Sequence, residues 1–239
     1  MGLMFGYVNH RFLPVVIVAA YIWFRDKYER EPFPLLLISL LAGALIVIPV
    51  MAVEAALSLA GENLEGLADA AWTAFAVAGF TEEMFKFIAL FLLIWKNRHF
   101  NEKYDGIVYA AFISLGFAAV ENVMYVMQDG HATGLLRAFT AVPAHAIFGI
   151  VMGYYTGMAK FYPKYRQRYK YMALFVPMLL HGIYDFILMT GYEWLWIFFL
   201  AFVIFLYITG LKRMKLLSDH SYFRTDFDLL NKKFTNDNP

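Results

Sequence analysis

Long apolar runs constrain the fold of this sequence more than any other feature. Leu35–Val53 contains no charged residue, and neither does Trp194–Leu211. A helix that crosses the hydrocarbon core of a bilayer needs roughly 20 mostly apolar residues, so both runs are candidate membrane spans. Charged residues make up only 16% of the 239-residue chain, whereas soluble domains average about 25%. The composition excludes an ordinary soluble domain, a disordered chain and a disulfide scaffold, and it indicates a polytopic membrane protein.

Seven segments are apolar enough and of about the length that a span requires. They are residues 3–24, 34–59, 70–95, 105–128, 135–159, 171–190 and 192–211. The strict alternation of a membrane β-barrel is absent, so helices are the expected spanning structure. We therefore expect an all-α, polytopic transmembrane helix bundle with about seven spans, located in the lipid bilayer of the cell membrane.

The loops between these segments alternate in charge. Lys and Arg are concentrated in the loops after the first, third and fifth segments and in the C-terminal tail, whereas the loop Gly61–Asp69 contains acids but no base. Basic loops stay on the cytoplasmic side, which predicts an N-terminus outside and a cytoplasmic C-terminus. Arg11 and Arg137 lie near outer helix ends, where we interpret them as snorkelling toward the headgroups.

We expect one transmembrane domain over residues 1–211 and a cytoplasmic tail over residues 212–239. Apolar residues recur in the tail at every third or fourth position, at Phe223, Phe227, Leu230 and Phe234. This spacing predicts an interfacial amphipathic helix, with an unstructured tail as the alternative.

The net charge of +1 offers no broad basic surface for nucleic acid. The absence of cysteine excludes thiol nucleophiles and thiolate metal ligands.

Ionisable residues inside the apolar segments stand out against this composition. Each charged side chain costs about 2.5–3.5 kcal/mol at the centre of a span. Seven such residues lie in four segments: Glu82, Glu83, Lys86, Glu121, His145, His181 and Asp185. Their clustering favours a functional site, and the alternative is a set of structural polar pairs that hold helices together. Glu54, near the outer end of the second segment, is interpreted as interfacial.

Helical spacing predicts which of these side chains meet. Glu82 and Lys86 are four residues apart and share a helix face, as do His181 and Asp185. Glu83 points about 100° away from Glu82 around the helix. We therefore expect a Glu–Lys pair on one helix and a His–Asp pair on another.

Depth along the helices predicts that the ionisable residues converge. At a rise of about 1.5 Å per residue, the carboxylates and histidines of all four segments lie between the outer face and the midplane. They would then line one chamber that opens outward. Phe117 lies one turn before Glu121 and would form a wall, and Asn122 adds a neutral donor and acceptor beside Glu121.

Carboxylate and imidazole groups suit the activation of water. A buried glutamate can take a proton from water and later give one to a leaving amine. Two histidines with carboxylates and an open position also suit catalytic zinc. The metal ligands would then be Glu121, His145, His181 and Asp185. The chain has no His-Glu-x-x-His motif, so no zinc motif decides the matter. Activation of water by glutamate and activation by a metal both stay open at this point.

Two other classes of membrane protein are alternatives to an enzyme. Buried Glu and His chains also carry protons in proton-coupled transporters, although the two halves of the chain show no repeat. A non-catalytic membrane scaffold is the third alternative.

Five short motifs follow one another along the chain. They are Asp26-x-x-Glu29-x-Glu31-Pro32, Glu82-Glu83-x-x-Lys86, Phe117-x-x-x-Glu121-Asn122, His145 and His181-x-x-x-Asp185. In this order, over roughly residues 15–190, they resemble the PrsW family of intramembrane proteases. That family forms a superfamily with the type II CAAX prenyl endopeptidases, which are similar in their paired-glutamate helix followed by two histidine motifs.

The resemblance implies an intramembrane endopeptidase that hydrolyses a peptide bond of a membrane-tethered protein substrate. The implied cut is of the site-one type, as in anti-sigma factors. We hypothesise that Glu82 is the general base and that Glu83 shares protons with it. His145 and His181 would position water, stabilise the oxyanion or bind a metal, and Asp185 would orient His181 or act as a ligand.

The remaining residues of the motifs would support this centre. Glu121 would complete the polar ring, with Phe117 and Asn122 beside it, and Lys86 would compensate charge. The resemblance is to a family described both as glutamic-type and as metallopeptidase, so the cofactor, with zinc as the candidate, stays open.

Overall fold

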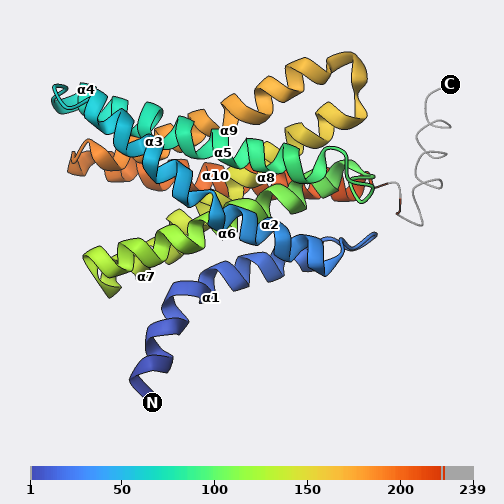
Figure 1. The fold of residues 1–239 in the computed structure, drawn as a ribbon, viewed down its shortest axis with the longest axis horizontal. Helices are drawn as coiled ribbons and strands as arrows, with labels where there is room; N and C mark the ends of the chain where they lie inside the picture. Colours follow the sequence, from blue (N-terminus) through green and yellow to red (C-terminus); the bar gives the residue numbers. More distant parts are fainter. Residues whose placement is uncertain (1, 222, 224–239) are drawn as a thin grey trace.

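The computed structural model describes residues 2–221 and 223, and these residues form an all-α bundle (Figure 1). Its helices are α1 (Gly2–Arg25), α2 (Phe33–Leu45), α3 (Val47–Ala60), α4 (Gly66–Ala71), η1 (Trp72–Phe80), α5 (Thr81–Ile94), α6 (Lys103–Asp129), α7 (His131–Phe139), α8 (Ala141–Phe161), η2 (Pro163–Tyr165), α9 (Arg166–Met189), η3 (Glu193–Leu195) and α10 (Trp196–Asp219). No strand occurs within the described ranges. The predicted all-α class is confirmed.

Five helical stretches within the described part of the chain are long and apolar enough to cross a membrane. They are Phe33–Ala60, Lys103–Asp129, Ala132–Phe161, Pro163–Met189 and Glu193–Asp219. Phe12–Arg25 is a shorter apolar helix, and the stretch from α4 to α5 is interrupted by the acids and the lysine of α5. The helical membrane bundle is confirmed, whereas the count of seven spans and the orientation stay predictions.

Helices α6 and α8 form the centre of the bundle, and glycine lets their backbones touch. A Cβ on Gly106 would lie 2.6 Å from the carbonyl oxygen of Gly153, and one on Gly149 would lie 2.6 Å from Oγ of Ser114. Small residues at helix contacts are typical of membrane bundles, where association depends on close packing rather than on the hydrophobic effect. The result is a rigid frame on which α8 presents His145.

The segment η1 is wound as a π-helix directly before the paired glutamates of α5. Oγ1 of Thr81 closes its end by donating to the carbonyl of Ala76 at 3.2 Å. A Cβ on Gly79 would lie 3.1 Å from the backbone nitrogen of Gly182, so η1 and α9 pack with their backbones in contact. π-helical turns are rare and are found mostly at functional sites.

The predicted segment 135–159 lies within the membrane-capable stretch Ala132–Phe161, which an irregular turn at Thr140 divides into α7 and α8. α7 begins after Gly130, whose φ of 88° suits glycine. It ends at Thr140, where α8 starts. Hydropathy reports the apolar character of both helices but cannot show the break between them, because the break depends on backbone angles.

The last described helix, α10, continues to Asp219, past the predicted domain boundary at residue 211. Its end is held at the start of α6, where Oγ of Ser221 donates to Glu102 at 2.6 Å. Most of the predicted amphipathic helix, including Phe227, lies outside the described residues. The division into residues 1–211 and 212–239 stays a prediction.

The α6–α8 contact can be tested with Gly153→Ala. The added Cβ would overlap the backbone carbonyl of Gly106, which cannot move without separating the helices. We expect a loss of about 1–3 kcal/mol, measured as a lower melting temperature in detergent.

Gly210→Ala is the matched control for this substitution. Its Cβ would meet side-chain atoms of Ile147 at 3.2 Å, and these atoms can shift. Equal melting temperatures for the two variants would contradict the close-contact interpretation.

Candidate active site

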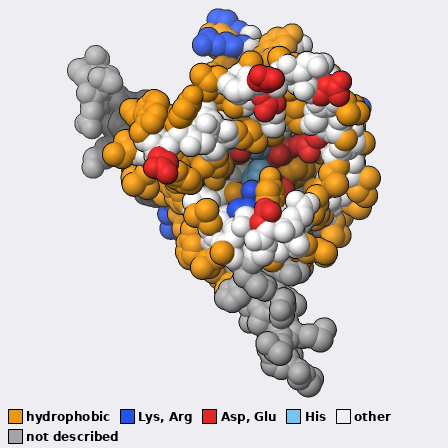
Figure 2. Space-filling view, turned by 90° about the vertical axis from the view of Figure 1, so that its left-hand side faces the viewer, with side chains coloured by type: hydrophobic (Ala, Val, Ile, Leu, Met, Phe, Trp, Pro, Cys, Tyr) orange, Lys and Arg blue, Asp and Glu red, His pale blue; other side chains and the backbone are white. Residues whose placement is uncertain are grey.

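A cavity of about 380 Å³ opens at the end of the bundle that carries the loops without basic residues. Figure 2 shows its mouth, with acidic and histidine side chains at the bottom of the hollow. Six of the predicted site residues line it: Glu82, Phe117, Glu121, His145, His181 and Asp185. The predicted convergence of these side chains in one chamber is confirmed.

The α5 lysine is the centre of the charge network. Nζ of Lys86 donates to Oε2 of Glu82 at 3.0 Å and to Oε1 of Glu83 at 2.7 Å. The predicted Glu82–Lys86 pair is confirmed. Glu83 reaches the same ammonium although it follows Glu82 directly, because residues three apart on a helix are also neighbours. Lys86 and Glu83 are both fully buried.

His145 connects α8 to this network. Its Nδ1 lies 3.1 Å from Nζ of Lys86, and because an ammonium only donates, Nδ1 is the acceptor. The ring proton then lies on Nε2, which is 2.7 Å from Oε2 of Glu121. Phe117 packs against both groups, with its ring centroid 4.2 Å from the Lys86 ammonium and 5.8 Å from the His145 ring.

His181 of α9 lies between two carboxylates. Nδ1 is 3.1 Å from Oε1 of Glu83, and Nε2 is 3.2 Å from Oδ2 of Asp185. The predicted His181–Asp185 pair is therefore confirmed. Phe148 stacks on the imidazole with centroids 4.9 Å apart. Carboxylates at both nitrogens fix the orientation of the ring.

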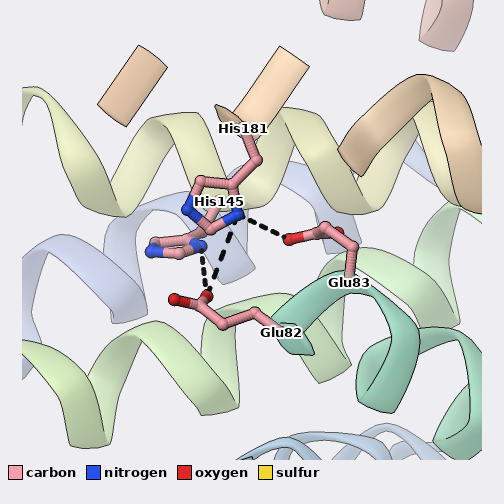
Figure 3. A group of neighbouring side chains, drawn as sticks. All are labelled: Glu82, Glu83, His145 and His181. Atoms are coloured by element: carbon pink, nitrogen blue, oxygen red, sulfur yellow. Dashed lines mark hydrogen bonds and ion pairs between the residues drawn. The ribbon is translucent and has the colours of Figure 1, made fainter. Parts of the chain in front are cut away.

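Glu82 occupies the position between the two histidines. Its Oε2 is 3.9 Å from Nδ1 of His145 and 3.9 Å from Nδ1 of His181 (Figure 3). Glu82 lines the cavity, whereas Glu83 is fully enclosed. The two neighbouring glutamates thus have different surroundings, and Glu82 is the one that can meet a molecule in the cavity.

Arg137 is a site residue that the sequence did not reveal. The interpretation that it snorkels is wrong, because its Nη2 lies 2.8 Å from Oε1 of Glu121 and its guanidinium lies 3.8 Å from the ring centroid of Tyr125. The physical reason is the packing of α7 against α6, which brings the guanidinium of Arg137 to the carboxylate of Glu121.

Two other residues lie where the sequence did not place them. Glu54 lines the cavity, so its interpretation as merely interfacial is wrong. Asn122 is fully buried and is not among the residues that line the cavity. Position near a helix end signals an interface, but only the packing of α3 against η1 and α5 shows which way Glu54 faces.

Four buried residues form a compact group with metal-ligand chemistry. Glu82, Glu83, His145 and His181 each offer one ligand atom, and these atoms all lie within 4.8 Å of one another (Figure 3). Two nitrogens and two oxygens match the donors that zinc prefers. The group shares its histidines with the predicted ligand set, but it contains the α5 glutamates in place of Glu121 and Asp185.

A buried carboxylate between two histidines, at the bottom of a cavity inside a membrane bundle, defines an intramembrane hydrolase. Comparison of the sequence with known proteins agrees with this class. The family described as "PrsW family intramembrane metalloprotease" matches residues 31–211, and the chain belongs to it.

Several similar proteins carry the name Protease PrsW. The protein of Bacillus subtilis is 37% identical over 213 residues, which cover 89% of this chain and 95% of the relative. The protein of Geobacillus kaustophilus is 37% identical over 191 residues, or 80% and 83%. The protein of Clostridioides difficile is 36% identical over 215 residues, or 87% and 90%. No solved structure matches.

These relationships support an enzyme rather than a transporter or a non-catalytic scaffold. The chain is an intramembrane protease and a multi-pass membrane protein. The transporter and scaffold alternatives are not favoured.

Removal of the Lys86 ammonium should destabilise the fold. Lys86→Met leaves Glu82 and Glu83 buried without their cation, and breaking a buried pair from one side costs about 3–5 kcal/mol. Adding Glu83→Gln to Lys86→Met should recover part of this loss, because the interaction is shared. Melting temperatures of the single and double variants measure both effects.

Lys164→Met serves as the control because Lys164 is exposed on η2. If Lys86→Met and Lys164→Met melted at the same temperature, the ammonium would not hold the site together.

Proposed function

We propose that the protein hydrolyses a peptide bond of a membrane-tethered protein substrate, with Glu82 as the general base. The observation that carries this proposal is the difference between the two neighbouring glutamates. Glu82 faces the cavity between two histidines, whereas Glu83 is enclosed and held by Lys86 and His181. A general base must reach the water that it deprotonates, and Glu82 meets this condition.

In the proposed reaction, Glu82 takes a proton from water while the water oxygen attacks the carbonyl carbon of the scissile bond. The C–N bond then breaks, and the proton passes from Glu82 to the leaving amine. His145 and His181 lie on either side of Glu82, where they would position the water and stabilise the oxyanion. Asp185 holds the orientation of His181 through the 3.2 Å contact.

Two further charged groups complete the proposed centre. Glu121 accepts from Arg137 and lies beside His145, so it fixes the outer side of the polar ring. Lys86 balances the charge of the α5 glutamates without facing the cavity.

Zinc is the metal that we propose for a metal-dependent reaction, in line with the family description. His145 and His181 would hold it together with carboxylates of the site, from the compact group or from Glu121 and Asp185. Bound zinc supplies Lewis acidity that activates water and polarises the carbonyl. The donor set fits, although Lys86 already contacts three members of the compact group.

The substrate that we propose is a membrane-tethered protein of the anti-sigma-factor type, which would receive a site-one-type cut at the outer side of the cell membrane. The opening of the cavity at the end without basic loops supports this side. A substrate tethered to the bilayer would reach the cavity by lateral diffusion. We therefore expect a soluble peptide of the same sequence to be cleaved more slowly.

The base assignment is tested with Glu82→Gln in proteoliposomes that contain a membrane-tethered reporter. The amide keeps the shape of the side chain but cannot accept the proton, so we expect cleavage to fall about 100- to 10,000-fold. Glu62→Gln, an exposed change in the α3–α4 loop, is the control. Cleavage by Glu82→Gln at the wild-type rate would refute the assignment.

Metal dependence is tested by chelation followed by return of zinc. We expect chelation to abolish cleavage and zinc to restore it, with one zinc per chain by elemental analysis. Zinc content of Glu82→Gln then distinguishes two roles, because a base can be lost without the metal whereas a ligand cannot. Full cleavage by protein free of metal would eliminate zinc and leave activation by glutamate.

A further inference from the structure

A second group of carboxylates lies at the end of the bundle opposite the cavity. Glu29 and Glu31 belong to the loop between α1 and α2, and Asp105 belongs to the first turn of α6. Each offers an oxygen, and these oxygens all lie within 4.8 Å of one another. In Figure 1 this loop lies at the far right, whereas the end that carries the cavity mouth lies at the left.

Each of the three carboxylates uses one oxygen to accept a hydrogen bond. Oε1 of Glu29 accepts from the side-chain amide of Asn101 at 3.0 Å, and Oε2 of Glu31 accepts from the hydroxyl of Tyr109. Oδ2 of Asp105 accepts from the backbone amide of Asn101 at 2.8 Å. These contacts fix the three side chains before any ligand arrives.

No backbone or side-chain donor group among the described residues reaches the second oxygen of each carboxylate. These oxygens are Oε2 of Glu29, Oε1 of Glu31 and Oδ1 of Asp105, and all three are buried. Glu31 is only 4% exposed and Asp105 is fully buried. A buried, unpaired carboxylate oxygen is costly, so the three oxygens together favour a bound cation.

No neighbouring side chain in the described ranges supplies that charge through an ion pair with these three carboxylates. The Arg30 guanidinium lies over the ring of Trp23 at 4.8 Å, and Nζ of Lys160 donates to the carbonyl of Trp95 at 2.7 Å. The protein alone therefore does not stabilise the ionised form of this group.

We propose that Glu29, Glu31 and Asp105 bind one hard divalent cation of the Mg²⁺ or Ca²⁺ class. Oxygen-only ligands select hard cations over zinc, which favours nitrogen and sulfur. Three carboxylate oxygens leave further positions for water, as Mg²⁺ requires. This site differs from the histidine-containing group of the cavity both in its ligands and in its place in the bundle.

The proposed cation would connect segments that are distant in the sequence. It would join the α1–α2 loop to the start of α6. The neighbouring Glu102 already accepts from Ser221 after α10. Binding at this point would therefore hold three parts of the chain together and raise the stability of the whole bundle.

Mn²⁺ binding by the full-length protein in detergent tests the proposal. After treatment with EDTA, the free Mn²⁺ signal in electron paramagnetic resonance gives the number of bound ions, and Mg²⁺ is added as competitor. We expect Glu31→Gln to lose one bound Mn²⁺ and Glu29→Gln to weaken that site at least tenfold. Glu83→Gln, in the cavity group, and Glu62→Gln should keep this ion.

Thermal unfolding gives a second measurement on the same proteins. At about 100 times its dissociation constant, Mg²⁺ should raise the melting temperature of the wild type by roughly 5 °C and leave Glu31→Gln unchanged. Glu29 is partly exposed, so Glu29→Gln carries the test if Glu31→Gln does not fold. Equal Mn²⁺ binding in wild type and both variants overturns the proposal. If Mg²⁺ does not change the melting temperature of the wild type, the proposal is also overturned. The buried carboxylate oxygens would then be neutralised by a shared proton.

Discussion

The structure of the site depends on one buried ammonium. Nζ of Lys86 lies within 3.1 Å of two carboxylates and one imidazole, and all four groups are buried inside the bundle. Two adjacent glutamates could not both be buried without a cation, because their charges would repel in a medium of low dielectric constant. The lysine neutralises them and at the same time fixes His145, so charge balance and geometry have a common source.

Close backbone contacts bring this ammonium and its partners together. Glycines let α6 approach α8 and let η1 approach α9, and these contacts determine how near His145 and His181 come to α5. Side chains in lipid gain little by leaving it, so the fit of small residues decides the arrangement of the helices. The chemistry of the cavity is therefore set by residues that carry no functional group.

Much of the site could be predicted from the sequence, because local spacing determines local pairs. Glu82–Lys86 and His181–Asp185 follow from a separation of four residues on a helix, and the scarcity of charge elsewhere made both pairs visible. Arg137 and Glu54 could not be placed in this way. The first depends on the packing of α7 against α6 and the second on the packing of α3 against η1 and α5, and neither leaves a periodic trace in hydropathy.

The π-helix before Glu82 makes the face of α5 that lines the cavity sensitive to the length of the chain rather than to its composition. A π-turn contains more residues than an α-turn, so η1 sets the angular register of everything in α5. Loss of a single alanine from Trp72–Phe80 would leave the segment just as apolar and just as able to enter the bilayer. If η1 kept its π winding, this loss would rotate Glu82 by about 100° relative to the upstream helix, away from both histidines.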